Sequence, residues 1–306
     1  MNGSGYIGGM VPPGFDGTVA SIHPRRAGQV TNVLVQDGLG PYFVSLISDR
    51  EDLTAGAIMV STRVSPGEPV VRRGETLFLP DRQVSLQHLE VWDGRPRLTS
   101  REASRIIAPE LVTALYRTLE ERTVFHRGMA LLLHPCPGDP ALREPWLERS
   151  RRIVSAGVNT LPVDLIGLGP GFTPAGDDFL TGVLLAHRLT ATAKGGGAGV
   201  DADTAGITAP EVDVVRARLR TTTAGGATIL RHALSGSFPF YLIKICGILT
   251  DPDTDQSEKT HRACRIAAEH GHSSGIDSLT GLLWCLSGGD TSVFPTTLDD
   301  GKRGQL

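Results

Sequence analysis

The chain has 306 residues, of which 40% are apolar and 21% charged, and its formal net charge is −3. This composition is typical of a folded protein with one large or two modest domains, and the near-balanced charge gives no reason to expect nucleic acid or an anionic membrane as partner. The sequence shows no apolar run of about 20 residues, no signal-peptide pattern at residues 1–11 and no CxxC pair among its four cysteines. We therefore expect a cytoplasmic protein with reduced thiols.

Short segments rich in Val, Ile, Leu, Phe and Tyr dominate the first hundred residues. They alternate with turn sequences, which is the pattern of strands joined by tight turns. Asp37-Gly38-Leu39-Gly40 has the composition of a hairpin connection. Residues 1–100 are therefore predicted to form a β-rich subdomain, a small antiparallel sheet or barrel. The predicted strands are Val30–Gln36, Tyr42–Ser48, Ala57–Ser61, Thr76–Leu79 and Val84–Trp92.

The pattern becomes helical after Arg101. Apolar residues recur at helical spacing from Glu102 to Thr123, with Ser100 as candidate N-cap. We find no internal repeat. Residues 101–306 are predicted to form a mainly helical subdomain on which the β-rich subdomain packs, which makes the fold class α+β. The further predicted helices are Leu142–Ala156, Asp177–Thr192, Glu211–Leu219, Ala224–Leu234, Phe240–Ile248, Glu258–Glu269 and Asp277–Leu286.

The segment GLGPGFTPAGDDFLTG, residues 167–182, is the most informative part of the sequence. In a functional interpretation, its backbone amides and the following helix start hold an anion, because glycines let a ligand approach the backbone. In a structural interpretation, it is a tight loop in which Asp177 caps the helix. We favour the functional interpretation, because two adjacent aspartates accompany the glycines, prolines and threonine. The predicted anion-binding residues are Gly169, Gly171, Thr173 and Gly176.

Asp177 and Asp178 are the predicted catalytic carboxylates of this loop. They could orient the attacking group, act as a base or bind a cation. An oxygen-rich site suits Mg²⁺ better than zinc, so the pair is also a candidate Mg²⁺ site. The loop has neither the Gly-Lys-Ser/Thr of the nucleotide P-loop nor the GxGxxG of dinucleotide-binding folds.

A second loop, Glu269–Asp277, gathers imidazoles, hydroxyls and a carboxylate between two predicted helices. Ser274 or Asp277 could cap the following helix, and His270 and His272 could ligate a metal, although HxH alone is a common pattern. We expect instead that His272 contacts a polar substrate or is a general acid or base. The predicted substrate-binding residues of this loop are Ser273, Ser274 and Asp277.

A third polar segment, Arg220–Gly226, leads into the predicted helix that contains Arg231. Threonines at a helix start commonly cap it. Arg220 or Arg231 could clamp a carboxylate or phosphate, or could lie in solvent. Thr222 and Arg231 are therefore added to the predicted substrate-binding residues.

Two other groups of residues are given less functional weight. The polar residues of His23–Arg26 and Asn32, near predicted strand ends, are expected to face water rather than substrate. The tryptophans, Trp92, Trp146 and Trp284, are expected in the core or at an interface.

Three of these segments resemble the AllH-type subunit family of oxamate carbamoyltransferase, formerly classed as a domain of unknown function. The string at residues 167–182 is similar to the family pattern GLGPGLTPSGDDFLxG, and GHSSGIDSLTG at residues 271–281 resembles GHTSGxDxLxG. Arg220–Thr223 followed by Leu230–Ala233 also fits the family layout. The resemblance covers most of the chain and is loosest in the β-rich part.

The resemblance implies a role in anaerobic purine (allantoin) catabolism. There, related subunits transfer a carbamoyl group between oxamate and phosphate, giving carbamoyl phosphate, together with two other subunit types, one of them similar to FdrA proteins. It brings no established catalytic residue with it. Phe172 and Ala175 stand where the family usually has Leu and Ser, which is consistent with a different substrate.

We therefore predict a carbamoyltransferase-like enzyme or subunit that acts on a small carboxylate or amide with phosphate or carbamoyl phosphate. Its site is expected where the two glycine-containing loops meet, between the subdomains. One alternative is an ATP- and Mg²⁺-dependent phosphotransferase or ligase that uses the same loop. Another is a non-catalytic subunit of a multi-subunit complex, with FdrA-like and other carbamoyltransferase subunits as partners.

Overall fold

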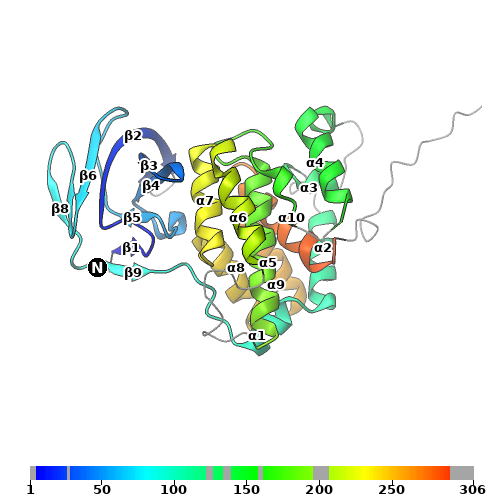
Figure 1. Cartoon of the computed structure of the whole chain (residues 1–306). Coiled ribbons are helices and arrows are strands. Elements are labelled where there is room, and N and C mark those ends of the chain that lie inside the picture. Colours follow the sequence, from blue (N-terminus) through cyan, green and yellow to red (C-terminus); the bar gives the residue numbers. More distant parts are fainter. Residues whose placement is uncertain are drawn as a thin grey trace, which may run out of the picture.

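The computed structural model describes residues 5–25, 28–121, 127–133, 139–157, 161–195 and 207–289. In these residues the chain forms an N-terminal sheet followed by a helical region, so the predicted α+β class is confirmed (Figure 1). The change from strands to helices falls between Trp92 and Ser100. A division into two subdomains at residue 100 stays a prediction.

Within the described residues, nine strands form one curled sheet. They are β1 (Tyr6–Gly8), β2 (Gly14–Arg25), β3 (Gly28–Asp37), β4 (Gly40–Ile47), β5 (Ala57–Met59), β6 (Pro69–Arg73), β7 (Thr76–Phe78), β8 (Gln83–Ser85) and β9 (Glu90–Trp92), in the order β8-β7-β6-β2-β3-β4-β5-β1-β9. The pairs β4–β5 and β1–β9 are parallel and the others antiparallel, so the predicted small antiparallel sheet or barrel is a mixed, curled sheet. The short connection 86–89 joins strands at opposite edges, and it can do so because the sheet curls.

The middle strands β2, β3 and β4 have two different faces. One face carries valines and leucines, such as Val33, Val44 and Leu46, which fill the core inside the curled sheet. The other face turns toward the helices and carries polar residues. The register pairs Ser21 with Asn32 and Asn32 with Ser45, so these three side chains form one row across the strands. This burial on both faces follows from the alternation of side chains along a strand.

The helices cover the second half of the chain. They are α1 (Ser100–Ile106), α2 (Pro109–Glu121), α3 (Ala130–Leu133), α4 (Pro145–Ser155), α5 (Ala175–Ala193), α6 (Ala209–Arg218), α7 (Ala224–Leu234), α8 (Phe240–Thr250), α9 (Gln256–Glu269) and α10 (Ser274–Leu286). The single helix predicted over Glu102–Thr123 is two helices, because Pro109 disfavours helical backbone in the residue before it. Thr99, not Ser100, is the N-cap of α1.

Helix α5 lies at the centre of the helical core and is buried on every side over its first three turns. It crosses α10 closely, because Gly182 and Gly281 have no side chain. A Cβ on Gly182 would overlap the carbonyl of Ser278, and one on Gly281 would overlap the carbonyl of Phe179. Both glycines end the string Asp-x-Leu-Thr-Gly, at residues 178–182 and 277–281, a short repeat that the sequence analysis did not recognise.

The tryptophans lie where they were predicted. Trp284 is buried and its ring contacts Phe179, while Trp146 is half-buried against the helical core. Trp92, at the end of the sheet, packs edge-on against Phe240 of α8. Each ring therefore serves a core or the junction between the two regions.

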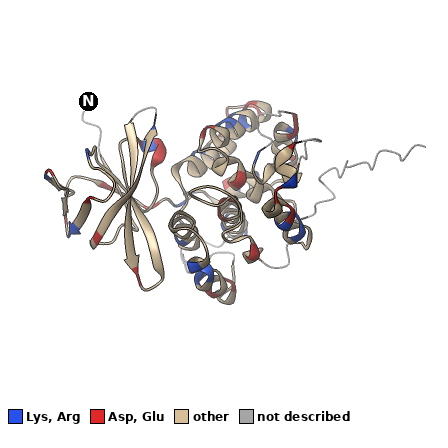
Figure 2. Ribbon diagram, turned by 90° about the horizontal axis from the view of Figure 1, so that it is seen from above, with Lys and Arg blue, Asp and Glu red and all other residues tan. Residues whose placement is uncertain are grey.

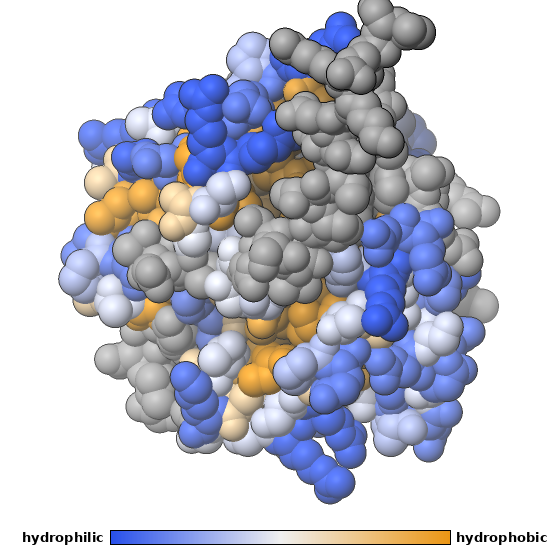
Figure 3. Space-filling model, turned by 90° about the vertical axis from the view of Figure 1, so that its right-hand side faces the viewer, coloured by the Kyte–Doolittle hydropathy of each residue, from blue (hydrophilic) through white to orange (hydrophobic). Residues whose placement is uncertain are grey.

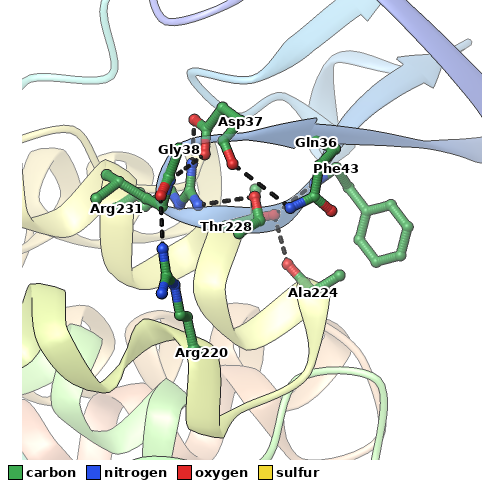
Figure 4. A network of polar contacts seen from close by, with 10 residues as sticks. Gln36, Asp37, Gly38, Phe43, Arg220, Ala224, Thr228 and Arg231 are labelled. Carbon is green, nitrogen blue, oxygen red and sulfur yellow. Dashed lines mark hydrogen bonds and ion pairs between the residues drawn. The ribbon is translucent and has the colours of Figure 1, made fainter.

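The hairpin between β3 and β4 docks on α7 (Figure 4). Arg231 forms an ion pair with Asp37 at 2.7 Å and donates to the Gly40 carbonyl at 3.2 Å. The Thr228 hydroxyl of the same helix accepts a hydrogen bond from the Phe43 N–H at 2.8 Å. Arg220 donates to the Gly38 carbonyl at 2.7 Å. Arg220 and Arg231, which the sequence left as either anion clamps or solvent-exposed residues, thus hold the sheet against the helices.

The outer surface is mixed in character. Charged residues of both signs lie on the outer faces of both regions (Figure 2). The end of the helical region farthest from the sheet shows mainly hydrophilic side chains around smaller apolar patches (Figure 3). Among the helices of the described residues, none combines the length and apolar character that crossing a membrane requires.

Candidate functional site

A cleft of about 420 Å³ lies between the polar face of the sheet and the helices. The predicted site residues that line it are Gly171, Thr173, Asp178, His272, Ser273 and Ser274. These residues come from both predicted loops, so the two loops meet at the cleft. We call this side of the cleft the helix wall. The opposite side, the sheet wall, is formed by residues from β2, β3 and β4 and from the turn after β4.

The other predicted site residues lie outside the lining of the cleft: Gly169, Gly176, Asp177, Thr222, Arg231 and Asp277. The loop glycines serve the backbone instead. Gly167, Gly169 and Gly171 have φ angles of 78°, 103° and 114°, which favour glycine. Gly169 packs against Ala175, and a Cβ on Gly176 would overlap the Leu165 carbonyl. Only Gly171 among the glycines predicted to bind an anion lines the cleft.

Asp177 is a buried clamp between two segments. Its Oδ1 accepts a hydrogen bond from the Gly167 N–H at 2.9 Å, and its Oδ2 accepts one from the Thr222 hydroxyl. Burial raises the pKa of Asp177 to about 6, although these hydrogen bonds lower it in part. The N-cap position of α5 belongs to Pro174, so Asp177 does not cap the helix as the structural interpretation proposed. Asp177 and Thr222 together fasten the glycine-rich loop to the start of α7.

Asp178, the next residue, contacts the cleft. Its Oδ2 accepts a hydrogen bond from the Thr173 hydroxyl at 2.8 Å, and that hydroxyl lies 3.2 Å from the Ser274 hydroxyl. Its Oδ1 is buried and accepts no hydrogen bond from the described residues. Burial raises the pKa of Asp178 well above its ordinary value, and the nearby Asp277 carboxyl raises it further. The Thr173 and Ser274 hydroxyls only partly offset this rise.

Asp277 lies below the cleft at the matching position of α10. Its Oδ1 accepts a hydrogen bond from the Met129 N–H, and a Cβ on Gly128 would overlap this carboxyl group. Its Oδ2 is buried without a hydrogen bond from the described residues. Burial raises the pKa of Asp277 to about 7, against the lowering effects of Met129, Ser273 and Arg127. The α5–α10 crossing thus brings two buried acids together, and only Asp178 reaches the cleft.

The predicted Mg²⁺ site can be compared with these contacts. Both oxygens of Asp177 accept hydrogen bonds from protein donors, whereas Asp178 has one oxygen without such a donor in the described residues. No cluster of three or more His, Cys, Asp or Glu side chains that could hold a metal occurs in the part of the chain that the structure describes. Because an ion shared by both aspartates would displace Gly167 or Thr222, Asp178 is the better candidate ligand. Mg²⁺ binding stays a prediction.

Several helices begin at the cleft. Thr173 precedes α5, Gly225 lies in the first turn of α7, Pro239 is the N-cap of α8, and Ser273 and Ser274 begin α10. The N-cap residues of α5, α8 and α10 make no side-chain hydrogen bond to their helices. The N–H groups at a helix start carry roughly half a positive charge, so this convergence favours a bound anion.

The helix wall lies within a segment that matches a known protein family. Residues 165–286 match the family model described as oxamate carbamoyltransferase subunit AllH. This segment is therefore similar to the AllH family. The searches of curated proteins and of solved structures gave no significant match. The AllH segment contains both motif loops and the helix starts of α5, α7, α8 and α10, and hence the whole helix wall.

The sheet wall lies outside the AllH segment. His23, Arg25, Asn32 and Ser45 line the cleft, and Asn32 is 3% exposed. The prediction that Asn32 faces water was wrong, and His23 and Arg25 also face the cleft. Arg26 lies outside the described residues. Sequence reasoning missed these residues because strand register, and not spacing along the chain, brings them together.

Three of the imidazoles that line the cleft have lowered pKa values. Burial and the neighbouring Arg231 lower the pKa of His232 to about 4, and burial and Arg25 lower that of His270 to about 4. Burial and Arg25 also lower the pKa of His23. These three rings are therefore neutral at neutral pH. Among the described lining residues, Arg25 is the one Lys or Arg side chain.

An aromatic contact joins the AllH segment to the sheet wall. Phe172 stacks on Phe43 with ring centroids 4.9 Å apart, and its ring edge meets His23 at 5.3 Å. The Phe172 carbonyl accepts a hydrogen bond from the Thr223 hydroxyl at 2.7 Å, and Gly225 leaves space for the ring. Phe172, though 41% exposed, therefore gives the polar cleft one apolar side.

Proposed function

We propose that this chain is a carbamoyltransferase-like enzyme, or the subunit of one, that acts on a small carboxylate or amide with phosphate or carbamoyl phosphate. The observation that carries the proposal is the convergence of helix starts and both AllH motif loops on one cleft. A cleft of about 420 Å³ has the size of a small-molecule site. The family match supports a subunit role, so partner subunits are part of the proposal.

The helix wall suits an anion and a developing negative charge. A phosphate or carbamoyl phosphate would bind at the starts of α5 and α10, with the Ser273 and Ser274 hydroxyls as further donors. In carbamoyl transfer from nitrogen to phosphate, a phosphate oxygen attacks the carbamoyl carbon and the C–N bond breaks. The carbonyl oxygen becomes negative in the transition state, and preorganised N–H and O–H donors stabilise that charge.

Asp178 is the proposed proton-transfer group. When the C–N bond breaks, the departing nitrogen takes up a proton, and in the reverse direction the attacking nitrogen loses one. A carboxyl whose pKa is raised well above its ordinary value keeps its proton to a higher pH and can donate it, and its conjugate base can take it back. Asp178 faces the cleft beside Thr173 and Ser274, and His272 lies across the same loop junction as a second candidate. Asp177 would act only by positioning the loop.

A ligand-binding experiment with the full chain tests this proposal. Thermal unfolding would be measured with phosphate, carbamoyl phosphate, oxamate or ATP, each with and without Mg²⁺, and carbamoyl transfer would be assayed with and without partner subunits. A ligand at about 100 times its Kd stabilises a fold by about 2.7 kcal/mol, which is readily measured. We expect stabilisation by phosphate or carbamoyl phosphate, and loss of transfer activity in Asp178→Asn.

The matched control is Asp213→Asn, because the Asp213 side chain on α6 is 75% exposed. It should leave binding and transfer unchanged. Stabilisation by ATP and Mg²⁺ alone would support a phosphotransferase instead. Phosphate binding without transfer, even with partner subunits, would indicate a non-catalytic subunit, and full transfer activity in Asp178→Asn would remove Asp178 from the mechanism.

We also propose a cytoplasmic location. Two of the cysteines that the structure describes, Cys246 and Cys285, are free thiols, and Cys246 and Cys264 are buried. Cys136 lies outside the described residues. Free thiols persist in a reducing compartment. Fractionation of cells that express the tagged chain would test this location directly.

A further inference from the structure

A chain of hydrogen bonds runs along the sheet wall. The Ser45 hydroxyl donates to Asn32 Oδ1 at 2.8 Å, and Asn32 Nδ2 donates to the Ser21 hydroxyl at 3.2 Å. The Ser21 oxygen lies 3.0 Å from His23 Nε2. These four side chains come from three adjacent strands and lie on the polar face of the sheet. Since Asn32 is 3% exposed, its amide is fixed by these partners and not by solvent.

The direction of this chain favours one tautomer of the His23 ring. Because Ser21 accepts a hydrogen bond from Asn32, its own hydrogen is available to His23 Nε2. A neutral imidazole that accepts at Nε2 carries its hydrogen on Nδ1. Burial and Arg25 lower the pKa of His23, which favours this neutral form. In this tautomer His23 presents Nδ1–H as a donor, and the ring lines the cleft.

Arg25 supplies positive charge beside this donor. Arg25 and His23 are two residues apart on β2, so their side chains share one face. Arg25 Nε donates to Asp52 Oδ1 at 3.0 Å, which orients the guanidinium. The field of Arg25 also reaches His270 on the other wall, whose pKa it helps to lower. A guanidinium next to an imidazole N–H is a suitable pair of donors for a carboxylate.

We propose that Arg25 and His23 bind the carboxylate of the organic substrate on the sheet wall, with Asn32 and Ser21 as positioning residues that keep His23 a donor. Phosphate then binds separately at the helix starts. The stacked rings of Phe172 and Phe43 join the two walls, and Phe172 contacts His23 beside the proposed carboxylate site. This inference rests on the proposed function, which supplies the two ligands.

The separation of the carboxylate site from the phosphate site also indicates which part of the chain selects the organic substrate. The AllH match covers the helix wall, residues 165–286, while every residue of the carboxylate site lies before residue 60. The organic substrate is therefore selected by residues outside the family segment. Changes on the sheet wall should alter the preferred carboxylate without loss of phosphate binding.

Separate calorimetric titrations of the full chain with oxamate and with inorganic phosphate test this division. Arg25→Gln should weaken oxamate binding at least about tenfold, as expected for loss of a charged hydrogen-bond donor, and should change the phosphate Kd less than about twofold. His23→Phe, which keeps a ring against Phe172, should also weaken oxamate binding selectively. Arg97→Gln is the matched control, because the Arg97 side chain is 83% exposed.

The positioning role has a spectroscopic signature. Imidazole ¹⁵N chemical shifts distinguish a ring with hydrogen on Nδ1 from one with hydrogen on Nε2. The wild-type His23 ring should carry hydrogen on Nδ1, and Asn32→Leu should shift this tautomer equilibrium and weaken oxamate binding, with an unchanged Kd for phosphate. The melting temperature of each variant shows whether it is folded.

Failures of the two proposals can be told apart. If phosphate binds but oxamate affinity is the same in Arg25→Gln and wild type, the carboxylate site is refuted and the proposed function stands. Equal weakening of both ligands, or hydrogen on Nε2 of wild-type His23, also overturns the inference. If the wild type binds neither ligand, alone or with partner subunits, the proposed function fails and the inference fails with it.

Discussion

The two walls of the cleft differ in how the chain builds them. The two motif loops of the helix wall contribute nearly contiguous residues, 170–173 with Asp178 and 270–274. The sheet wall is built from separate, non-adjacent residues of β2, β3 and β4 and of the turn that follows, between His23 and Thr54. A local loop keeps its chemistry together in sequence, whereas a sheet assembles its chemistry by register. Sequence motifs therefore indicated the residues of the helix wall but not those of the sheet wall.

The adjacent aspartates show the same contrast on a smaller scale. Asp177 and Asp178 are neighbours in sequence, but successive residues of a helix point about 100° apart. Asp177 therefore meets α7 and the loop backbone, while Asp178 meets α10 and the cleft. Proximity in sequence does not make the two carboxylates one site.

The largest effect is expected where the helical region depends on a glycine. Gly281→Ala places a Cβ against the Phe179 carbonyl and should lower the free energy of unfolding by about 3 kcal/mol or more. Gly247→Ala on α8 is the control, because a Cβ there has no neighbour within 4 Å. It should stabilise the protein by up to about 1 kcal/mol through helix propensity. Urea unfolding compares them, and equal effects would contradict the close helix crossing.

The second effect concerns the buried acids. Because the pKa of Asp277 is raised to about 7 from its ordinary 3.8, its contribution to stability is full below about pH 4 and is lost as pH rises through about 7. Asp277→Asn removes this pH-dependent loss of stability, which is on the order of a few kcal/mol between pH 4 and pH 8. The variant should gain stability relative to wild type as pH rises.

Other charged or titratable groups lie around Asp277 and contribute to the pH dependence of stability in that experiment. Asp177 and Asp178 on α5 also have raised pKa values. The Tyr241 hydroxyl on α8 donates a hydrogen bond to the Ser278 hydroxyl. The positive charge of Arg127, in the segment before α3, lowers the pKa of Asp277. Wild type and variant will therefore share part of the pH dependence. Melting temperatures at several pH values measure the difference, and parallel curves for the two proteins would rule out a raised pKa at Asp277.

A smaller effect is expected at the junction of the two regions. Arg231→Met removes the ion pair with Asp37 and the hydrogen bond to the Gly40 carbonyl, and should cost about 1–3 kcal/mol because the Arg231 side chain is only 11% exposed. Arg220→Met, which loses one bond at the surface, should cost about 1 kcal/mol or less. Chemical unfolding would measure both. A larger loss of stability from Arg220→Met than from Arg231→Met would contradict this order.

The smallest effect on stability is expected at Phe172. Phe172→Leu removes the stacking on Phe43 and should cost about 0.5–1.5 kcal/mol, since the ring is partly exposed. Oxamate binding should weaken more than phosphate binding, because the ring faces the proposed carboxylate side. Calorimetry with both ligands checks this, and selective loss of phosphate would contradict the arrangement.

The sequence by itself determined the features that depend on local chemistry. The helix predicted at Ala224–Leu234 has those bounds in the structure, Thr223 caps it, and Asp37–Gly40 joins the predicted hairpin. Helical periodicity and turn composition act over a few residues, so they can be recognised without the fold. The two motif loops were found for the same reason.

Only the tertiary structure decided which side chains share a site. It separated Asp177 from Asp178, paired Asp178 with Asp277 through the α5–α10 crossing, and paired Arg231 with Asp37 of the hairpin. It also placed His23 and Asn32 at the cleft through the pairing of β2 with β3. Helix crossings and strand register are set by packing between residues far apart in the chain, and no local pattern encodes them.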